Sequence, residues 1–288
     1  MARSLADTAA VQQWLDPVAE WLQPRLQGLL SDASVGNLLD GVWFGAPLHP
    51  ALTDVPVGSW TAALVLDAVD VFAGDPRLGF AADAALAVGT AAAVPAAVTG
   101  LADFRWLPGE IRRVGLTHAG LNSISVALSV ASLLARRRGR RARGRALSLA
   151  AYTISSSSAH LGGTMSFGLG ERVNHEIETG APDGFTAVLD DAELSAGQLV
   201  RVDVEGTPVL LTRASDGAVC AISNTCSHAG GPLNEGAREG DVVTCPWHGS
   251  RFDVCTGKVR QGPAVYPQRR FGTRVRDGRI EVGPPDQA

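Results

Sequence analysis

Nearly continuous apolar runs fill the middle of the chain. Four such segments cover residues 51–72, 78–101, 114–135 and 146–169. As a helix, each is long enough to cross about 30 Å of hydrocarbon. The last is diluted by serines 155–158 and two following glycines. The pattern predicts a four-helix transmembrane domain over residues 43–170, with a buried helical bundle of a soluble protein as the alternative.

The segment before this domain, residues 1–42, shows a different periodicity. Apolar side chains recur at helical spacing, with charged and polar residues between them. These are Val11, Trp14, Leu15, Val18, Trp21, Leu22 and Leu26. We expect an amphipathic helix that lies at the membrane surface, and a simple packing helix fits the same pattern.

After the apolar region the pattern becomes that of a β domain. Residues 171–184 are polar, include Pro182 and Gly184, and are interpreted as a linker. Short alternating runs between turn residues then predict strands at 199–204, 208–212, 219–223, 242–244 and 279–282. The predicted fold is α + β with two domains, the second being an all-β domain over residues 185–288.

Composition supports a membrane protein and argues against a nucleic-acid partner. Of the 288 residues, 45% are hydrophobic and only 19% are charged, and the formal net charge is −4. An acidic chain lacks the electrostatic footprint that nucleic-acid binding requires. The expected partner of the apolar half is the lipid bilayer.

Two Cys–His pairs lie within the β domain. Cys226-x-His228 and Cys245-x-x-His248 are separated by sixteen residues. Two thiolates and two imidazoles suit a soft or borderline metal, and zinc is the simplest such ion. Cys220 and Cys255 remain, and we expect each to be a small buried hydrophobe rather than part of a disulfide framework.

The sequence around the second pair, CPWHGSRFD at residues 245–253, resembles that of Rieske [2Fe–2S] domains. The resemblance implies that Cys226 and Cys245 hold one iron, and that His228 and His248 hold the other near solvent. It also implies that Ser250 lies beside a bridging sulfide. Residues 262–264, which include Gly262 and Pro263, match the proline loop that covers the cluster in this family.

Two departures from the high-potential type of this family bear on the expected reduction potential. Gly231 stands where that type has a bracing disulfide cysteine, and Phe252 stands where it has a tyrosine. With fewer hydrogen bonds to sulfur, we expect a ferredoxin-like potential in the lower half of roughly −150 to +300 mV.

The apolar half resembles a second family. The stretches are GAPLHPALTDVPVGSWTAALVLD at 45–67, TGLADF at 99–104, the His118-x-x-x-Asn122 pair and HLGG at 160–163. They are similar to a bacterial four-helix membrane domain catalogued as domain of unknown function 2231. That resemblance implies a fold but little about activity.

Three histidines of the apolar half are candidates for a cofactor site. His118 and His160 lie about equally far from the arginine-rich loop between the third and fourth segments, and His49 precedes the first segment. Histidines at one depth suggest a haem b or quinone site, and hydrogen-bonded packing is the alternative. Asp67 and Asp83 are intramembrane carboxylates and thus further functional candidates.

The arginine-rich loop also indicates orientation. Residues 136–145 include seven arginines, which favours a cytoplasmic position and places the Rieske-like domain on the outer face. Arg140-Arg141, followed by a mildly apolar helix, is similar to a twin-arginine export signal for folded domains. The missing bracing disulfide favours the reducing cytosol instead, and both positions stay open here.

The sequence as a whole predicts a membrane-anchored electron-transfer protein that exchanges electrons with a redox partner protein, or with haem b or quinone in its membrane domain. The alternatives are an electron-delivery component for an oxygenase and a non-catalytic redox sensor. We expect a carrier rather than a stand-alone oxygenase, because nothing after Val282 supplies a 2-His-1-carboxylate iron site.

Overall fold

The computed structural model describes residue 8 and residues 12–286, and Val11 of the predicted N-terminal helix lies outside this range. The chain forms two compact units. The helical unit comprises residues 1–30 and 48–169, and the β unit comprises residues 31–47 and 170–288. Residues 31–47 and the predicted linker thus pack with the β domain, because their polar side chains bond to its loops.

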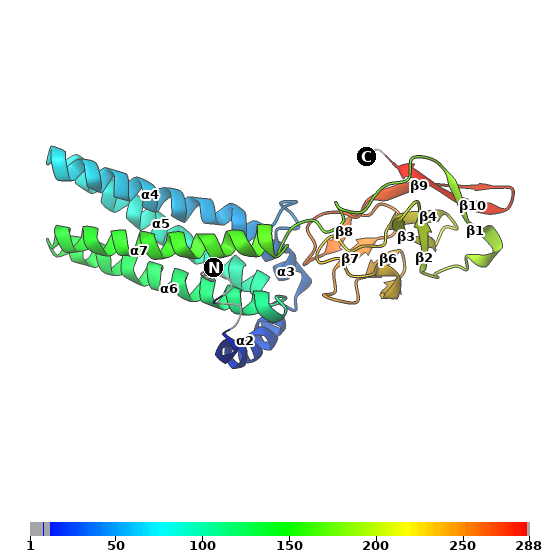
Figure 1. The fold of residues 1–288 in the computed structure, drawn as a ribbon, viewed down its shortest axis with the longest axis horizontal. Helices are drawn as coiled ribbons and strands as arrows, with labels where there is room; N and C mark the ends of the chain where they lie inside the picture. Colours follow the sequence, from blue (N-terminus) through cyan, green and yellow to red (C-terminus); the bar gives the residue numbers. More distant parts are fainter. Residues whose placement is uncertain (1–7, 9–11, 287–288) are drawn as a thin grey trace. The chain divides into compact units, whose positions relative to one another are not determined.

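Four long helices form the body of the helical unit (Figure 1). They are α4 (Leu48–Ala73), α5 (Pro76–Phe104), α6 (Gly109–Arg137) and α7 (Arg141–Gly163), and a short π-helical turn, η2 (Thr164–Gly168), follows. Among the described helices, α4, α5 and α6 are long and apolar enough to cross a membrane. Helix α7 is not among these three, since serines and arginines dilute its sequence.

The helical hairpins α4–α5 and α6–α7 repeat one another. In each hairpin, Nδ1 of a histidine on the first helix hydrogen-bonds to a backbone carbonyl of the second helix. The histidine ring also contacts a glycine of the second helix, four residues after the residue that supplies this carbonyl. The sets are His49, Ala96 and Gly100, and His118, Ser158 and Gly162, with Nδ1–O distances of 2.8 Å in both. The two glycines leave room for the imidazoles, because an added Cβ would lie 2.9 Å and 3.3 Å from the ring.

Helix α2 (Asp16–Leu29) confirms the predicted amphipathic helix, though it starts later than the periodicity does. Ala19 and Leu26 are buried against Phe104 and Leu107 at the end of α5. Large apolar side chains stay exposed, namely Val18 and Trp21 of α2 and Trp14 of the short 3-10 helix η1 (Gln13–Leu15) before it. Contact of these side chains with a membrane surface stays a prediction.

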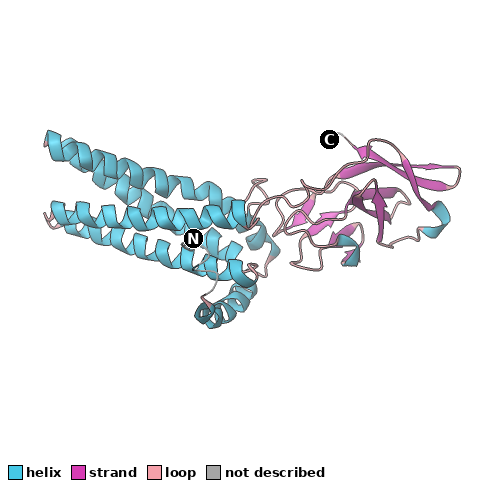
Figure 2. Cartoon of the chain, viewed as in Figure 1, coloured by secondary structure: helices cyan, strands magenta, loops and turns pink. Residues whose placement is uncertain are grey.

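The β unit has two antiparallel sheets (Figure 2). The six-stranded sheet has the order β1-β10-β9-β4-β3-β2, and the four-stranded sheet has the order β5-β6-β7-β8. The strands of the first are β1 (Thr186–Asp190), β2 (Val200–Val204), β3 (Thr207–Arg213), β4 (Val219–Ser223), β9 (Arg270–Arg276) and β10 (Arg279–Pro285). Those of the second are β5 (Ala237–Glu239), β6 (Val242–Thr244), β7 (Arg251–Asp253) and β8 (Val259–Gln261).

The five strands that alternation predicts are confirmed as β2, β3, β4, β6 and β10. The sequence pattern misses β5, β7 and β8, which have three residues each and, unlike the equally short β6, no two adjacent apolar residues. It also misses β1 and β9.

The prediction for Cys220 and Cys255 is wrong. They form a disulfide between β4 of the larger sheet and the turn after β7 of the smaller one, with their Cα atoms 4.9 Å apart. The sheet register brings together two cysteines that are 35 residues apart in the sequence. The two sheets are therefore linked covalently, beside the core that holds the remaining two cysteines.

One short helix from the N-terminal part of the chain also belongs to the β unit. Helix α3 (Ala33–Asp40) is capped by Asp32, whose carboxylate accepts from two backbone N–H groups, and it ends at Gly41 in the left-handed conformation. It packs beside β8.

Candidate functional site

Two loops with the same backbone geometry hold the Cys–His pairs. Residues 226–231 follow β4, and residues 245–250 join β6 to β7. In each loop the cysteine N–H donates to the carbonyl five residues on, and the N–H of a glycine four residues on donates back to the cysteine carbonyl. Those glycines, Gly230 and Gly249, have φ of +79° and +75°, which side chains rarely adopt.

Cys226 and Cys245 lie side by side at the base of these loops. Both are buried and neither is disulfide-bonded. A hydrogen bond between the two thiols lowers the pKa of Cys245 to about 6 and raises the pKa of Cys226, and backbone N–H groups of each loop also stabilise the thiolates. The pair therefore loses one proton readily, and a second thiolate requires a cation beside it.

His228 and His248 form the second pair. Their ring centroids are 4.9 Å apart and the rings are perpendicular. Burial lowers the pKa of His248, which favours the neutral imidazole that binds metals. The expectation that both imidazoles lie near solvent is wrong for His228, which is only 9% exposed, whereas His248 is half-buried.

The donors are arranged as two pairs rather than as one tetrahedral group. Among the residues that the structure describes, no three His, Cys, Asp or Glu side chains converge as a site for a single ion. A [2Fe–2S] cluster fits two pairs, because each iron takes two protein ligands. When bound, such a cluster accepts and donates one electron. Cys226 and Cys245 would hold one iron, and His228 and His248 the other.

The surroundings fit the predicted roles of Ser250, Gly262 and Pro263. Ser250 is fully buried, and its Oγ accepts from Ala264 N at 3.0 Å, which leaves its proton for another acceptor. Gly262 and Pro263 are buried in the loop after β8. These contacts join the proline loop to the second cysteine loop.

The two departures from the high-potential type have clear structural counterparts. A Cβ added to Gly231 would lie 2.9 Å from Cys245 Sγ and 3.0 Å from the Trp247 ring, so a cysteine does not fit there. Phe252 is fully buried and has no hydroxyl to donate to sulfur. The lower potential stays a prediction.

Residues 184–272 match the family described as Rieske [2Fe-2S] domain. Ferredoxin CarAc of Metapseudomonas resinovorans is 35% identical over 92 residues, which cover 32% of this chain and 85% of that protein. The chain belongs to the Rieske family. The ferredoxin component of biphenyl 2,3-dioxygenase from Rhodococcus jostii is 37% identical over 31% of this chain and 83% of its own length. The Rieske domain accounts for electron transfer, and these relatives match only this part of the chain.

A solved structure gives a similar alignment. The ferredoxin of carbazole 1,9a-dioxygenase from Nocardioides aromaticivorans IC177 has 36% sequence identity over 35% of this chain and 99% of its own length, with a TM-score of 0.34. Residues 45–175 match the family described as "Predicted membrane protein (DUF2231)".

The three histidines of the helical unit do not share one environment. His49 and His118 are half-buried with ring centroids 6.3 Å apart, whereas His160 is exposed. His118 Nδ1 lies 2.8 Å from Ser158 O, and its Nε2 lies 3.0 Å from Asn122 Nδ2. Both nitrogens of that ring are thus engaged by protein atoms.

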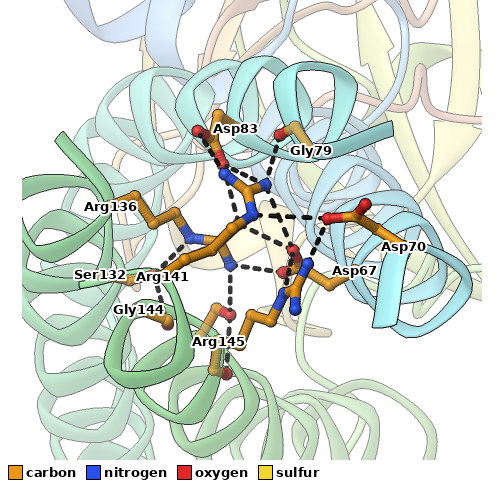
Figure 3. A network of polar contacts seen from close by, with 10 residues as sticks. Asp67, Asp70, Gly79, Asp83, Ser132, Arg136, Arg141, Gly144 and Arg145 are labelled. Atoms are coloured by element: carbon orange, nitrogen blue, oxygen red, sulfur yellow. Dashed lines mark hydrogen bonds and ion pairs between the residues drawn. The ribbon is translucent and has the colours of Figure 1, made fainter. Parts of the chain in front are cut away.

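The carboxylates predicted to be intramembrane belong to an ion-pair network at the other end of the same bundle (Figure 3). Three aspartates of α4 and α5 contact three arginines of α6 and α7: Asp67, Asp70 and Asp83, and Arg136, Arg141 and Arg145. Asp67 lies eighteen residues after His49, and Arg136 lies eighteen residues after His118. Asp67 and Arg136 pair with each other. The equal number of opposite charges indicates a structural role.

Sequence reasoning missed one set of residues beside the candidate metal centre. Asn37, Asp40 and Arg172 bond to one another or to the proline loop. No local motif marks them, because their partners lie about 90 to more than 200 residues away. The Asp32 cap before a short apolar run was the one local signal for α3.

Proposed function

We propose that this protein is a membrane-anchored one-electron carrier. Its Rieske domain exchanges electrons with a partner protein, and its helical unit anchors that domain to the bilayer. The observation that supports this best is the pairing of buried Cys226 and Cys245 beside His228 and His248, in one chain with three apolar helices.

Electrons enter and leave through His248 in this proposal. His248 is half-buried and Trp247 beside it is 55% exposed, whereas His228 is covered by the protein's own chain. A ligand at the surface gives a short path to a partner's cofactor. The Rhodococcus jostii relative is the ferredoxin component of biphenyl 2,3-dioxygenase, which supports a protein as the partner and makes an oxygenase the second candidate.

The proposal includes four membrane crossings. Helix α3 precedes α4, residues 170–288 follow α7, and both belong to the β unit. The chain therefore enters and leaves the membrane on the same side, which requires an even number of spans. With α4, α5 and α6 apolar enough to cross, α7 is the fourth span, and ion pairs neutralise Arg141 and Arg145 near its start.

The Rieske domain lies on the outer face in this proposal. Arg137, Arg138, Arg140 and Arg143 are exposed at the turn between α6 and α7, which favours the cytoplasm for that turn. The Cys220–Cys255 disulfide supports the same orientation, since disulfides persist mainly outside the cytosol.

Single cysteines introduced at exposed positions test this orientation. Arg143→Cys should react with a membrane-impermeant maleimide only in inverted vesicles, and Ser195→Cys only in right-side-out vesicles. The unmodified chain is the control, since two of its cysteines are disulfide-bonded and two are buried. If both variants were labelled in the same vesicles, the α6–α7 turn and the Rieske domain would lie on the same side of the membrane. That result would contradict an even number of spans with both chain ends outside.

No electron passes through haem or quinone in this proposal. His118 uses both ring nitrogens in protein contacts and His160 is exposed, so the three histidines do not offer a shared ligand set. His49 instead joins α4 to α5, and His118 joins α6 to α7.

An optical and potentiometric titration of the purified full chain tests the function. We expect one reversible one-electron transition of the cluster, in the lower half of roughly −150 to +300 mV, and no Soret band. The dithionite-reduced protein should transfer one electron to oxidised cytochrome c as a probe. A Soret band that disappears in His118→Ala would contradict the route proposed here and establish a haem, and a cluster that cytochrome c cannot reoxidise would contradict a carrier.

A further inference from the structure

We propose that helix α3 and Arg172 form a clamp that holds the proline loop over the cluster and excludes water from the His228 side. Neither belongs to the residues 184–272 that match the Rieske family. The clamp is defined as Asn37 and Asp40 of α3 together with Arg172. Arg172 and Asn37 are positioning residues, which act on the cluster through the loop.

The first contact joins α3 to the start of the proline loop. Asn37 Oδ1 accepts from Gly262 N at 2.8 Å, and Asn37 Nδ2 donates to Arg260 O at 3.4 Å. A Cβ added to Gly262 would lie 2.6 Å from Asp40 Oδ2, so only glycine allows this close approach. The amide of Asn37 thus fixes the backbone of the loop where it leaves β8.

The second contact is a buried charged pair. Arg172 donates through Nη2 to Asp40 Oδ1 at 3.1 Å and through Nη1 to Pro263 O at 2.8 Å. Asp40 is 1% exposed and the Arg172 side chain 5% exposed. A charge is buried only where its partners compensate for the lost water, so this pair holds Arg172 at the loop carbonyl.

The loop and the segment after Arg172 then reach both cysteine loops. Ala264 N donates to Ser250 Oγ of the second loop at 3.0 Å. On the other side, Ser227 Oγ donates to Tyr266 O at 2.8 Å, and Ser227 O accepts from His175 N at 3.1 Å. A displacement of the clamp would therefore displace the two loops that carry Cys226 and Cys245.

The same segment covers one imidazole. Arg172 and Val173 line a small cavity together with His228 and the proline loop, which accounts for the burial of His228 while His248 stays half-buried. Solvent access to a metal centre affects its reduction potential. Opening the clamp would admit water, which stabilises the more negative reduced state and raises the potential.

The inference rests on the cluster of the proposed function, so each variant is first assayed for iron and acid-labile sulfide. The main variant is Asn37→Ala in the full-length holoprotein, which leaves every charge in place. Ser34→Ala, on an exposed position of the same helix, is the matched control. Gly262→Ala opens the clamp from the opposite side, and Asp40→Asn/Arg172→Gln removes the pair without changing the net charge.

Three measurements follow. In variants that keep the cluster, we expect at least tenfold faster hydrogen exchange in a peptide that contains Gly262. Pulsed EPR in D₂O should show more deuterium near the reduced cluster, and the reduction potential should shift upward. Ser34→Ala should match the parent chain.

Faster exchange with an unchanged potential and deuterium signal would overturn the clamp's effect on the cluster and leave a structural contact only. If Asn37→Ala alone lost its iron, the reduction potential of Gly262→Ala would decide. An unchanged potential in Gly262→Ala would overturn the inference. Absence of iron and sulfide from the unmodified chain would instead overturn the proposed function.

Discussion

Replacement of Cys245 by alanine is expected to abolish the cluster, with iron and acid-labile sulfide reduced by about tenfold or more, because one iron keeps a single thiolate. The site cannot recruit a substitute, since the other two cysteines are joined to each other. Colorimetric iron and sulfide assays of the purified full chain, with EPR of the dithionite-reduced sample, measure this loss.

The double variant Cys220→Ala/Cys255→Ala is the matched control, because it also removes cysteines. It should keep the full iron and sulfide content. Loss of a disulfide that closes a loop of this length costs about 4 kcal/mol of unfolding free energy, so the control should melt earlier but retain its spectrum. A full cluster in Cys245→Ala would contradict the ligand assignment.

The second large effect is expected in the ion-pair network of the helical unit. Arg136→Ala leaves Asp67 and Asp83 facing each other without the guanidinium that lies between them. Removal of one partner of a buried ion pair costs about 3–5 kcal/mol, which corresponds to a decrease in melting temperature of roughly 10 °C for a unit of this size. Thermal unfolding of the detergent-purified chain, followed by circular dichroism, measures the change.

A double-mutant cycle separates pairing from packing. Asp67→Asn/Arg136→Gln should lose less stability than the sum of its single variants, because the pair then carries no uncompensated charge. Arg143→Gln, on an exposed arginine of the same turn, should change the unfolding free energy by less than about 0.5 kcal/mol. Strict additivity in the cycle would show that the ion pair does not couple the two hairpins.

The candidate cluster ligands could be found from the sequence because each Cys–His pair lies within one short loop. The spacing of Cys226 and His228, and of Cys245 and His248, is local, and the flanking turn residues are specific to the family. Helices α4, α5 and α6 were likewise readable, since an apolar run of sufficient length needs no partner to be recognised.

Contacts between distant segments could not be predicted in this way. Cys220 and Cys255 meet only because the register of β4 brings them together, and one residue of slippage would point Cys220 to the other face. Asn37 and Gly262 are more than 200 residues apart, and the burial of His228 depends on that same packing. Alternation and helical periodicity report which face is buried, not which segment covers it.

The most direct test of the central claim is pulsed EPR of the reduced full-length protein, with metal and sulfide analysis of the same sample. The account predicts iron and acid-labile sulfide at a ratio of about 1:1, and couplings from two histidine nitrogens, those of His228 and His248. Zinc without labile sulfide, or a reduced cluster without nitrogen couplings, would contradict it.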